Sequence, residues 1–188
     1  TMPMKMREMA RKILHQPEEI NIAISKPPEK ILQQAYVVYE AQKIPLIKDI
    51  LTHKDFQSVI VFCSKKQNVK QLTRELKRAR LSVEEIHSDL EQQQREQVLQ
   101  DFRNKKLKIL VATDILSRGI DIEDIDLVIN FDVPNDGEDY VHRIGRTARA
   151  ASEGTAYTLI SEREQNKFAQ IESLIERQVE KAVVPEVF

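Results

Sequence analysis

The sequence predicts an α/β fold in which a mostly parallel central sheet carries helices on both faces. Strand-like segments alternate along the chain with segments of helical periodicity, as βαβ crossovers require. Several of the strands are apolar at successive positions, which is typical of a sheet covered on both sides. The 188 residues include only four glycines and seven prolines, so the connecting loops are expected to be short.

Each strand is predicted from a run of β-branched, aromatic or apolar residues, and each helix from apolar residues spaced three and four apart. The predicted strands cover residues 34–40, 58–63, 82–87, 108–113, 126–131 and 154–161. The predicted helices cover residues 42–52, 65–80, 92–104 and 162–181. These elements account for most of the chain after residue 33.

The first 33 residues lack the alternation of strands and helices that is predicted for the rest of the chain. Apolar side chains at helical spacing between residues 6 and 14 predict a helix, which Pro17 ends. Residues 17–33 carry three prolines and mixed charge, which is typical of a linker. We therefore divide the chain into a helix-and-linker segment, residues 1–33, and a domain, residues 34–188.

Composition narrows the class of protein. Apolar residues make up 41% and charged residues 31%, which excludes a disordered tail and a collagenous repeat. No apolar stretch approaches the roughly 18 residues that span a bilayer, so no membrane partner is expected. The net charge of −1 means that any nucleic-acid-binding surface must be local. The single cysteine, Cys63, ends an apolar strand, which predicts a buried packing role and a reducing, cytoplasmic setting.

Ligands of open parallel sheets bind beyond the carboxyl ends of the strands. Four predicted strands are followed there by polar segments of unusual composition. These segments are Ser64–Lys66, Ser88–Asp89, Thr113–Asp121 and Asp132–Arg149. The sequence therefore directs attention to one edge of the sheet.

The segment ATDILSRGID (112–121) joins a strand end to a tight turn at Arg118–Gly119, and Asp121 follows the turn. Glycine lets a backbone approach a ligand closely. The Asp121 carboxylate suits ribose hydroxyls, and it equally suits a structural pair with an arginine. Local chemistry leaves both interpretations open.

In HRIGRTAR (142–149), Arg143, Arg146 and Arg149 are spaced so that they would share roughly one side of a helix. Guanidinium groups match phosphate oxygens in bidentate fashion, so the cluster favours phosphate binding. The alternative is pairing with residues 121–139, which hold eight acidic side chains and no basic one. His142 lies within the same cluster.

The chain contains no GxxxxGK[ST] segment and no GxGxxG segment. It therefore lacks a triphosphate cradle of its own. An arginine cluster without a cradle suits a domain that completes a site built by another domain, as arginine fingers do in phosphoryl transfer.

Four of these segments together resemble motifs of the C-terminal RecA-like domain of the DEAD-box ATP-dependent RNA helicases, and in detail the bacterial RhlE-like subgroup. VIVFCSKK (59–66) is similar to motif IV, and HSDLEQQQR (87–95) to the H-G-D-x-x-Q-x-x-R element. ATDILSRGID is similar to motif V, and YVHRIGRTAR (140–149) to motif VI. The four occur in the family's order between residues 34 and about 161.

The resemblance implies a RecA-like three-layer sandwich. Thr1-Met2-Pro3 is similar to the end of the family's S-A-T-M-P motif, which closes the first RecA-like domain. Residues 1–33 would then be the last helix of that preceding domain and the interdomain linker. Residues 34–188 would be the helicase C-terminal domain.

The resemblance also implies a role for individual positions. Arg146 and Arg149 match the catalytic arginines that contact the γ-phosphate, and Asp121 and Gly119 match nucleotide-binding positions. His142 and Arg143 match residues that link the two domains. The positions matching RNA contacts are Ser64, Gln92, Arg95, Thr113 and Arg118.

The implied cofactor is ATP with Mg²⁺, whose metal ligands would lie in the N-terminal RecA-like domain, so no metal site is expected here. The implied partners are that domain and single-stranded or short duplex RNA. The function would be RNA-stimulated ATP hydrolysis with local duplex unwinding, and the chain by itself would be inactive.

Two residues depart from the family pattern, because Ser88 and Ala148 stand where the family usually has glycine. RNA affinity is the property that Ser88 would affect, since a serine restricts the backbone where it must approach a phosphate. Two alternatives remain at this point: a non-catalytic RNA- or nucleotide-binding adaptor, and a domain of a DNA-directed superfamily 2 helicase.

Overall fold

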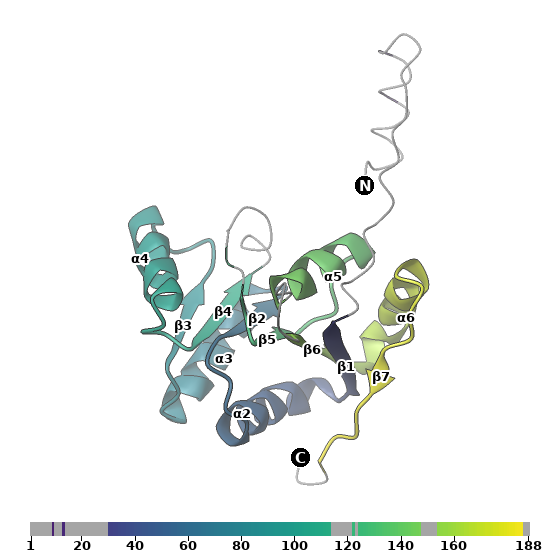
Figure 1. Ribbon diagram of the computed structural model, residues 1–188, viewed down its shortest axis with the longest axis horizontal. Helices are drawn as coiled ribbons and strands as arrows, with labels where there is room; N and C mark the ends of the chain where they lie inside the picture. Colours follow the sequence, from purple (N-terminus) through teal and green to yellow (C-terminus); the bar gives the residue numbers. More distant parts are fainter. Residues whose placement is uncertain are drawn as a thin grey trace.

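The computed structural model describes Met9, Ile13 and residues 30–113, 122, 124–147 and 154–185. Its centre is a parallel sheet of seven strands in the order β3-β4-β2-β5-β6-β1-β7 (Figure 1). The strands are β1 (Ile31–Val37), β2 (Val59–Cys63), β3 (Val83–Ile86), β4 (Ile109–Thr113), β5 (Leu127–Asn130), β6 (Gly154–Ile160) and β7 (Glu180–Lys181). The predicted parallel sheet is confirmed, and every pairing runs parallel.

Helices cover both faces of the sheet. One face carries α2 (Lys43–His53) and α3 (Lys66–Arg78), and the other carries α4 (Gln92–Arg103), α5 (Gly137–Ile144) and α6 (Gln165–Leu174) (Figure 1). Successive residues of one strand serve the two faces: Val61 packs in the α2–α3 core, whereas Phe62 packs in the α4 core. This alternation explains why the strands are apolar throughout. The expected three-layer sandwich is confirmed.

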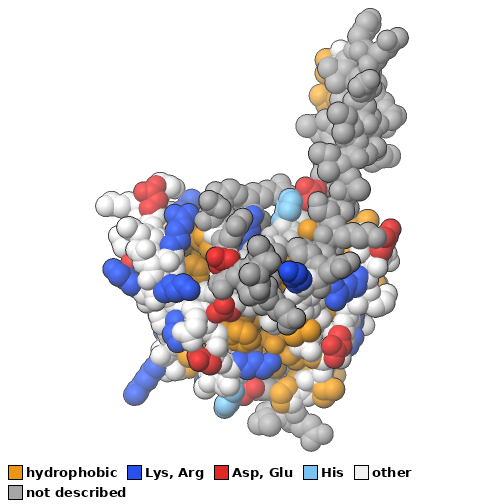
Figure 2. All heavy atoms as spheres, viewed as in Figure 1, with side chains coloured by type: hydrophobic (Ala, Val, Ile, Leu, Met, Phe, Trp, Pro, Cys, Tyr) orange, Lys and Arg blue, Asp and Glu red, His pale blue; other side chains and the backbone are white. Residues whose placement is uncertain are grey.

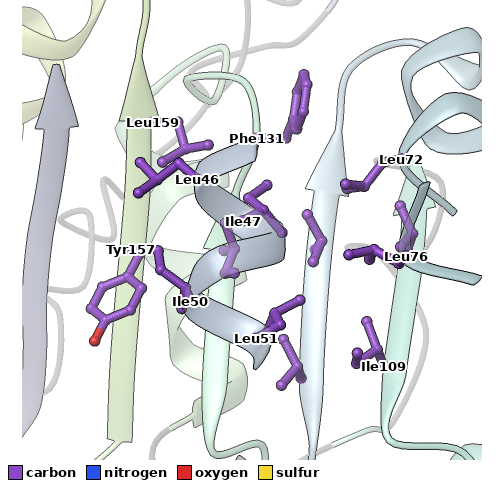
Figure 3. Close-up of a cluster of buried hydrophobic side chains, with 14 of the residues drawn as sticks. Leu46, Ile47, Ile50, Leu51, Leu72, Leu76, Ile109, Phe131, Tyr157 and Leu159 are labelled. Carbon is purple, nitrogen blue, oxygen red and sulfur yellow. The ribbon is translucent and has the colours of Figure 1, made fainter. Parts of the chain in front are cut away.

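The core under α2 shows how the helical periodicity is used. Leu46, Ile47, Ile50 and Leu51 lie along one side of the helix and point at the sheet, next to side chains of α3 (Figure 3). Cys63 is fully buried in the same cluster, so its predicted packing role is confirmed. Tight packing of this kind stabilises the layer through apolar surface removed from water.

The first strand begins earlier than predicted, at Ile31 instead of residue 34. The missed residues include a polar one, Gln33, which is only 3% exposed. The Tyr140 hydroxyl donates a hydrogen bond of 2.8 Å to Gln33 Oε1, so the side chain is accommodated inside the α5–α6 layer. β1 therefore includes the last three residues of the segment 1–33, whose assignment to a preceding domain stays a prediction.

The predicted helix over residues 162–181 is wrong in its second half. A 3-10 turn, η4 (Glu162–Glu164), leads into α6, which ends at Leu174, and Glu176 takes a positive φ of 53°. Glu172 Oε1 then accepts hydrogen bonds from the backbone N–H of Val179 at 2.8 Å and from Lys181 Nζ at 2.5 Å. These contacts hold the chain against β1 as β7, and tertiary pairing replaces the helical pattern.

The remaining predicted elements agree with the structure to within about two residues. The predicted apolar stripe between residues 6 and 14 lies outside the described residues, apart from Met9 and Ile13, which are helical. Within the described part of the chain, no helix has the length and apolar character needed to cross a membrane.

Candidate functional site

The first residues of the four polar segments meet at the carboxyl edge of the sheet. The strand register pairs Cys63 with Thr113 and Ile86 with Ala112, so Ser64, Thr113 and Ser88 come at the ends of neighbouring strands. On the other side of β2, Phe62 pairs with Asn130, which brings Ser64 next to Asp132. The structure therefore assembles the edge that the sequence predicts, from residues that are up to 68 positions apart.

Arg95 and Thr113 carry polar atoms at this edge that have no partner among the described residues. Arg95, on α4, donates a hydrogen bond of 3.1 Å from NH2 to the Ser88 carbonyl. Arg95 Nε and Thr113 Oγ1 are buried and find no hydrogen-bond partner among the residues that the structure describes. Buried polar atoms are normally satisfied. Their arrangement therefore suits a ligand with several acceptor oxygens.

Ser64 and Gln92 are exposed. The Ser64 backbone N–H donates a hydrogen bond of 2.7 Å to Asp132 Oδ2, which fixes the start of the loop after β2. Gln92 lies at the first turn of α4 and donates from Nε2 to Glu96 Oε1 at 2.8 Å. Gln92 is therefore on the same helix as Arg95 and open to solvent.

The basic run of residues 65–80 lies on α3 and is largely balanced by acidic neighbours. Asp89 accepts hydrogen bonds from Lys70 and Lys66, each at 2.9 Å, and these bonds hold the pKa of the Asp89 carboxyl well below its usual range. Lys77 pairs with Glu84 in the same way. Figure 2 shows red and blue side chains interspersed over the side where α3 and α4 lie. The run is thus a mixed, solvated surface.

The segment Asp132–Arg149 begins at the same edge but leaves it. Asp136 caps α5, since its Oδ1 accepts from the Asp139 N–H at 2.8 Å. The helix runs back across the sheet, and the chain continues as a 3-10 turn, η3 (Gly145–Thr147). The Arg146 carbonyl accepts from Ile125 N at 3.2 Å, just before β5 begins. The backbone of Arg146 therefore lies near the amino end of β5, which corrects its predicted place at the carboxyl edge.

The α-helix ends at Ile144, so Arg143 lies on α5 and Arg146 on η3, while Arg149 lies outside the described residues. Arg143 is fully buried, with NH1 donating to Asn130 Oδ1 at 3.1 Å and to the Asp132 carbonyl at 3.4 Å, and Cζ lies 5.3 Å from the centre of the Phe62 ring. Arg146 is partly exposed. Arg143 is thus held by an amide oxygen and a backbone carbonyl of residues 121–139, whereas the structural alternative predicted carboxylates as its partners.

His142 is exposed on α5, next to the buried Arg143. Four predicted site residues, Arg118, Gly119, Asp121 and Arg149, lie outside the described residues, as does Ala148. Among the residues that are described, no group of three or more His, Cys, Asp or Glu side chains could hold a metal ion.

Sequence reasoning missed a buried ion cluster behind Ser64. Lys43 is fully buried at the start of α2 and lies 2.9 Å from Glu164, 3.0 Å from Glu40 and 3.6 Å from Asp132. Burial alone would lower the pKa of Lys43, but its hydrogen bonds and charged neighbours outweigh burial and raise it. A lysine in the first turn of an amphipathic helix does not indicate a buried ion cluster. The one available signal was Asp132, a carboxylate that directly follows an apolar strand.

The chain was compared with known proteins. Residues 42–151 match the family described as "Helicase conserved C-terminal domain". ATP-dependent RNA helicase DbpA of Bacillus subtilis is 37% identical over 186 residues, which cover 98% of this chain and 39% of that protein. RNA helicase CrhR of Synechocystis is 37% identical over 187 residues, covering 98% of this chain and 38% of that protein. The chain thus spans well under half the length of these curated relatives.

Two solved structures are similar in fold. The E. coli DEAD-box protein SrmB, bound to regulator of ribonuclease activity A, has a TM-score of 0.76 at 32% identity, covering 84% of this chain and 93% of that one. S. cerevisiae Dbp5 bound to RNA and ADP BeF3 has a TM-score of 0.84 at 27% identity, covering 97% and 49%. This chain therefore belongs to the helicase conserved C-terminal domain family and, within it, to the DEAD-box RNA helicases. The narrower RhlE-like assignment stays a prediction.

Proposed function

We propose that this domain acts as the second RecA-like domain of an ATP-dependent RNA helicase. It contributes arginines to an ATP site shared with an N-terminal RecA-like domain, and it contributes part of a single-stranded RNA-binding surface. The observation that carries the proposal is the carboxyl edge of the sheet, where Ser64, Ser88 and Thr113 meet and where Arg95 Nε and Thr113 Oγ1 are buried without a described partner. Phosphate oxygens of one RNA strand supply the acceptors that these donors require.

The RNA surface consists of residues from three segments at this edge. Ser64 and Thr113 come from neighbouring strands, and Arg95 reaches the same place from α4. Gln92 and Arg118 complete the surface by their match to the family motifs. Contacts of this kind bind the phosphate backbone of the RNA and not its bases. RNA binding is therefore expected to weaken as salt rises and to depend little on RNA sequence.

In the ATP site, Arg146 and Arg149 stabilise negative charge on the γ-phosphate, while Asp121 and Gly119 bind the nucleotide. The guanidinium groups suit this task because they present fixed pairs of donors to phosphate oxygens. ATP with Mg²⁺ supplies the phosphoryl group that is transferred to water, and the metal ligands belong to the N-terminal domain. His142, exposed on α5, faces the contact between the two domains. Arg143, whose motif position implies the same role, is buried inside this domain and supports α5 from within.

Relatives support this proposal by their names, since DbpA is called an ATP-dependent RNA helicase and the solved Dbp5 structure holds RNA and ADP BeF3. The cytoplasmic setting predicted from the single cysteine is part of the same proposal.

The test supplies a DEAD-box N-terminal domain, in trans or joined at Thr1, and measures RNA-stimulated ATP hydrolysis. Replacing Arg149 or Arg146 by alanine is expected to lower the turnover number by about 10³-fold or more. Arg177→Ala is the matched control, because Arg177 is exposed beyond the far end of α6. The chain alone is expected to show no ATP hydrolysis, and turnover by the pure chain would contradict a shared site.

The same assay separates the alternatives. RNA binding that persists with no effect of either arginine replacement favours a non-catalytic adaptor. Equal stimulation by DNA and RNA of the same sequence favours a DNA-directed helicase, because the 2′-hydroxyl is what distinguishes the two ligands.

A further inference from the structure

Lys43 is a buried cation that touches three carboxylates and no part of the proposed RNA or ATP site. It occupies the first turn of α2, its side chain is fully buried, and its Nζ lies 5.2 Å from the centre of the Phe131 ring. Nζ is hydrogen-bonded to Glu164 at 2.9 Å and paired with the exposed Glu40 at 3.0 Å. The third carboxylate, Asp132, is 3.6 Å away and only 15% exposed.

The two partly buried carboxylates each hold backbone groups at strand ends. Asp132 Oδ2 accepts from the Ser64 N–H at 2.7 Å, directly after β2. Glu164 Oε1 accepts from Val133 N at 2.9 Å, after β5, and Oε2 accepts from Ser161 N at 3.0 Å, after β6. One ammonium group therefore joins the ends of three adjacent strands to the start of α2.

Asp132 also contacts the segment that carries the motif VI arginines. Its carbonyl accepts from Arg143 NH1 at 3.4 Å, while its carboxylate holds Ser64. A shift of Asp132 would thus change the position of both the loop after β2 and α5. The position of this one residue sets how those two segments lie relative to each other.

Stability alone does not account for a lysine at this position. A buried ion pair contributes little compared with a well-packed apolar side chain of the same volume. What an apolar side chain cannot do is orient a carboxylate. Without the ammonium group, the partly buried Asp132 carboxylate would lose a neighbouring positive charge, which favours its turning toward solvent.

We propose that Lys43 is a positioning residue for the RNA-binding edge: it orients the Asp132 carboxylate, which in turn fixes the Ser64 backbone relative to α5. This inference rests on the proposed function, because it takes the loop after β2 to be an RNA contact. Lys43 itself touches neither RNA nor nucleotide.

The first test uses this chain and does not depend on function. Amide hydrogen exchange of Ser64 is expected to become about tenfold faster or more in Lys43→Met, because one hydrogen bond to a charged acceptor is lost. Lys48→Met, the same change on the exposed side of α2, is the matched control and leaves Ser64 unchanged. Unchanged Ser64 exchange in a folded Lys43→Met variant overturns the inference.

A second pair of variants covers the case in which Lys43→Met fails to fold. Asp132→Ala removes the acceptor directly and is expected to reproduce the fast Ser64 exchange, whereas Asp132→Asn keeps an acceptor oxygen and most of the protection. If Ser64 exchange is the same in all three proteins, the carboxylate does not hold this loop and the inference fails.

The functional readout uses the two-domain protein. In Lys43→Met, the RNA concentration for half-maximal ATPase stimulation is expected to rise about fivefold, the value of one weakened hydrogen bond, while the turnover number at saturating RNA stays within about twofold. An unmoved RNA requirement in an RNA-stimulated enzyme overturns the positioning role. A wild type without any RNA stimulation contradicts the proposed function instead, and Ser64 exchange still decides whether Lys43 holds the loop.

Discussion

At the scale of single residues, Arg143 heads the fully buried side chains ranked by volume. Burying a guanidinium is costly unless its donors are satisfied. Here Asn130 Oδ1 and the Asp132 carbonyl accept from NH1, and the Phe62 ring faces Cζ, so part of this cost is offset. Asn130 is held in turn by Thr158, since its Nδ2 donates to Thr158 Oγ1 at 3.1 Å. The buried polar chain ties α5 to three neighbouring strands.

Position 154 requires glycine because the backbone of Thr147 lies very close to it. A Cβ at this position would lie 2.2 Å from both the carbonyl oxygen and Oγ1 of Thr147, at the end of η3. Gly154→Ala is therefore expected to lower the free energy of unfolding by about 1–3 kcal/mol, measured by urea denaturation.

Gly145→Ala is the control for that change, because a Cβ there meets nothing within 4 Å among the described residues and the backbone is right-handed helical. It is expected to leave stability unchanged or slightly raised. Equal losses in the two variants would show that the contact between Gly154 and Thr147 is not tight.

At the scale of elements, α5 depends on its amino-terminal cap. Asp136 Oδ1 accepts from the Asp139 N–H at 2.8 Å, and Glu138 and Asp139 add negative charge to the first turn. Asp136→Ala is expected to lower the free energy of unfolding by about 1 kcal/mol. Thermal and urea unfolding of the chain provide the measurement.

Asp136→Asn separates capping from charge, because asparagine caps about as well as aspartate. Asp136→Asn should unfold close to the wild type. A loss as large as that of Asp136→Ala would assign the effect to the carboxylate's charge and contradict the capping interpretation.

At the scale of the whole molecule, the cluster around Lys43 links stability to pH. Burial alone would raise the pKa of Glu164, but hydrogen bonds from Ser161 and Lys43 outweigh burial and lower it from its ordinary value of 4.5. A carboxylate with a lowered pKa contributes stability above its unfolded-state pKa, and this contribution is lost as pH falls through the folded-state pKa. The pKa of Lys43 is raised above its ordinary value of 10.5. Lys43 therefore contributes stability below pH 10.5, and this contribution is lost only in strong alkali.

Glu164→Gln is therefore expected to be less stable than the wild type near neutral pH. The unfolding free energies of the two proteins should converge as pH falls from about 7 to about 3. Urea denaturation across that range measures the convergence. Glu162→Gln, an exposed neighbour in η4, is the control and should keep the wild-type pH profile. Parallel profiles for the wild type and Glu164→Gln would show that this carboxylate is not linked to folding.

Much of the molecule was predictable from sequence because its signals are local. Apolar runs and helical periodicity identify β2, α3, α4, β4, β5 and β6, and parallel order follows from their alternation. Since parallel strands share one carboxyl edge, the convergence of Ser64, Ser88 and Thr113 also follows from order alone. The family motifs then give these positions their expected roles, which the proposed experiments test.

Features that depend on distant partners were not predictable. Helical periodicity continues past Leu174, but the contacts of Glu172 with Val179 and Lys181 turn that segment into β7. Gln33 is polar and was therefore not expected inside the protein, but Tyr140 supplies a buried hydrogen-bond partner for it.

The sequence by itself thus determined the fold class, the order of the strands along the chain and the place of Ser64, Ser88 and Thr113 at the carboxyl edge. Only the tertiary structure decided that α5 carries Arg146 away from that edge and that Lys43 is buried among carboxylates from three segments. The physical reason is the distance along the chain over which each interaction acts. Backbone propensity and periodicity act over a few neighbouring residues, whereas burying a charge requires partners that folding alone brings together.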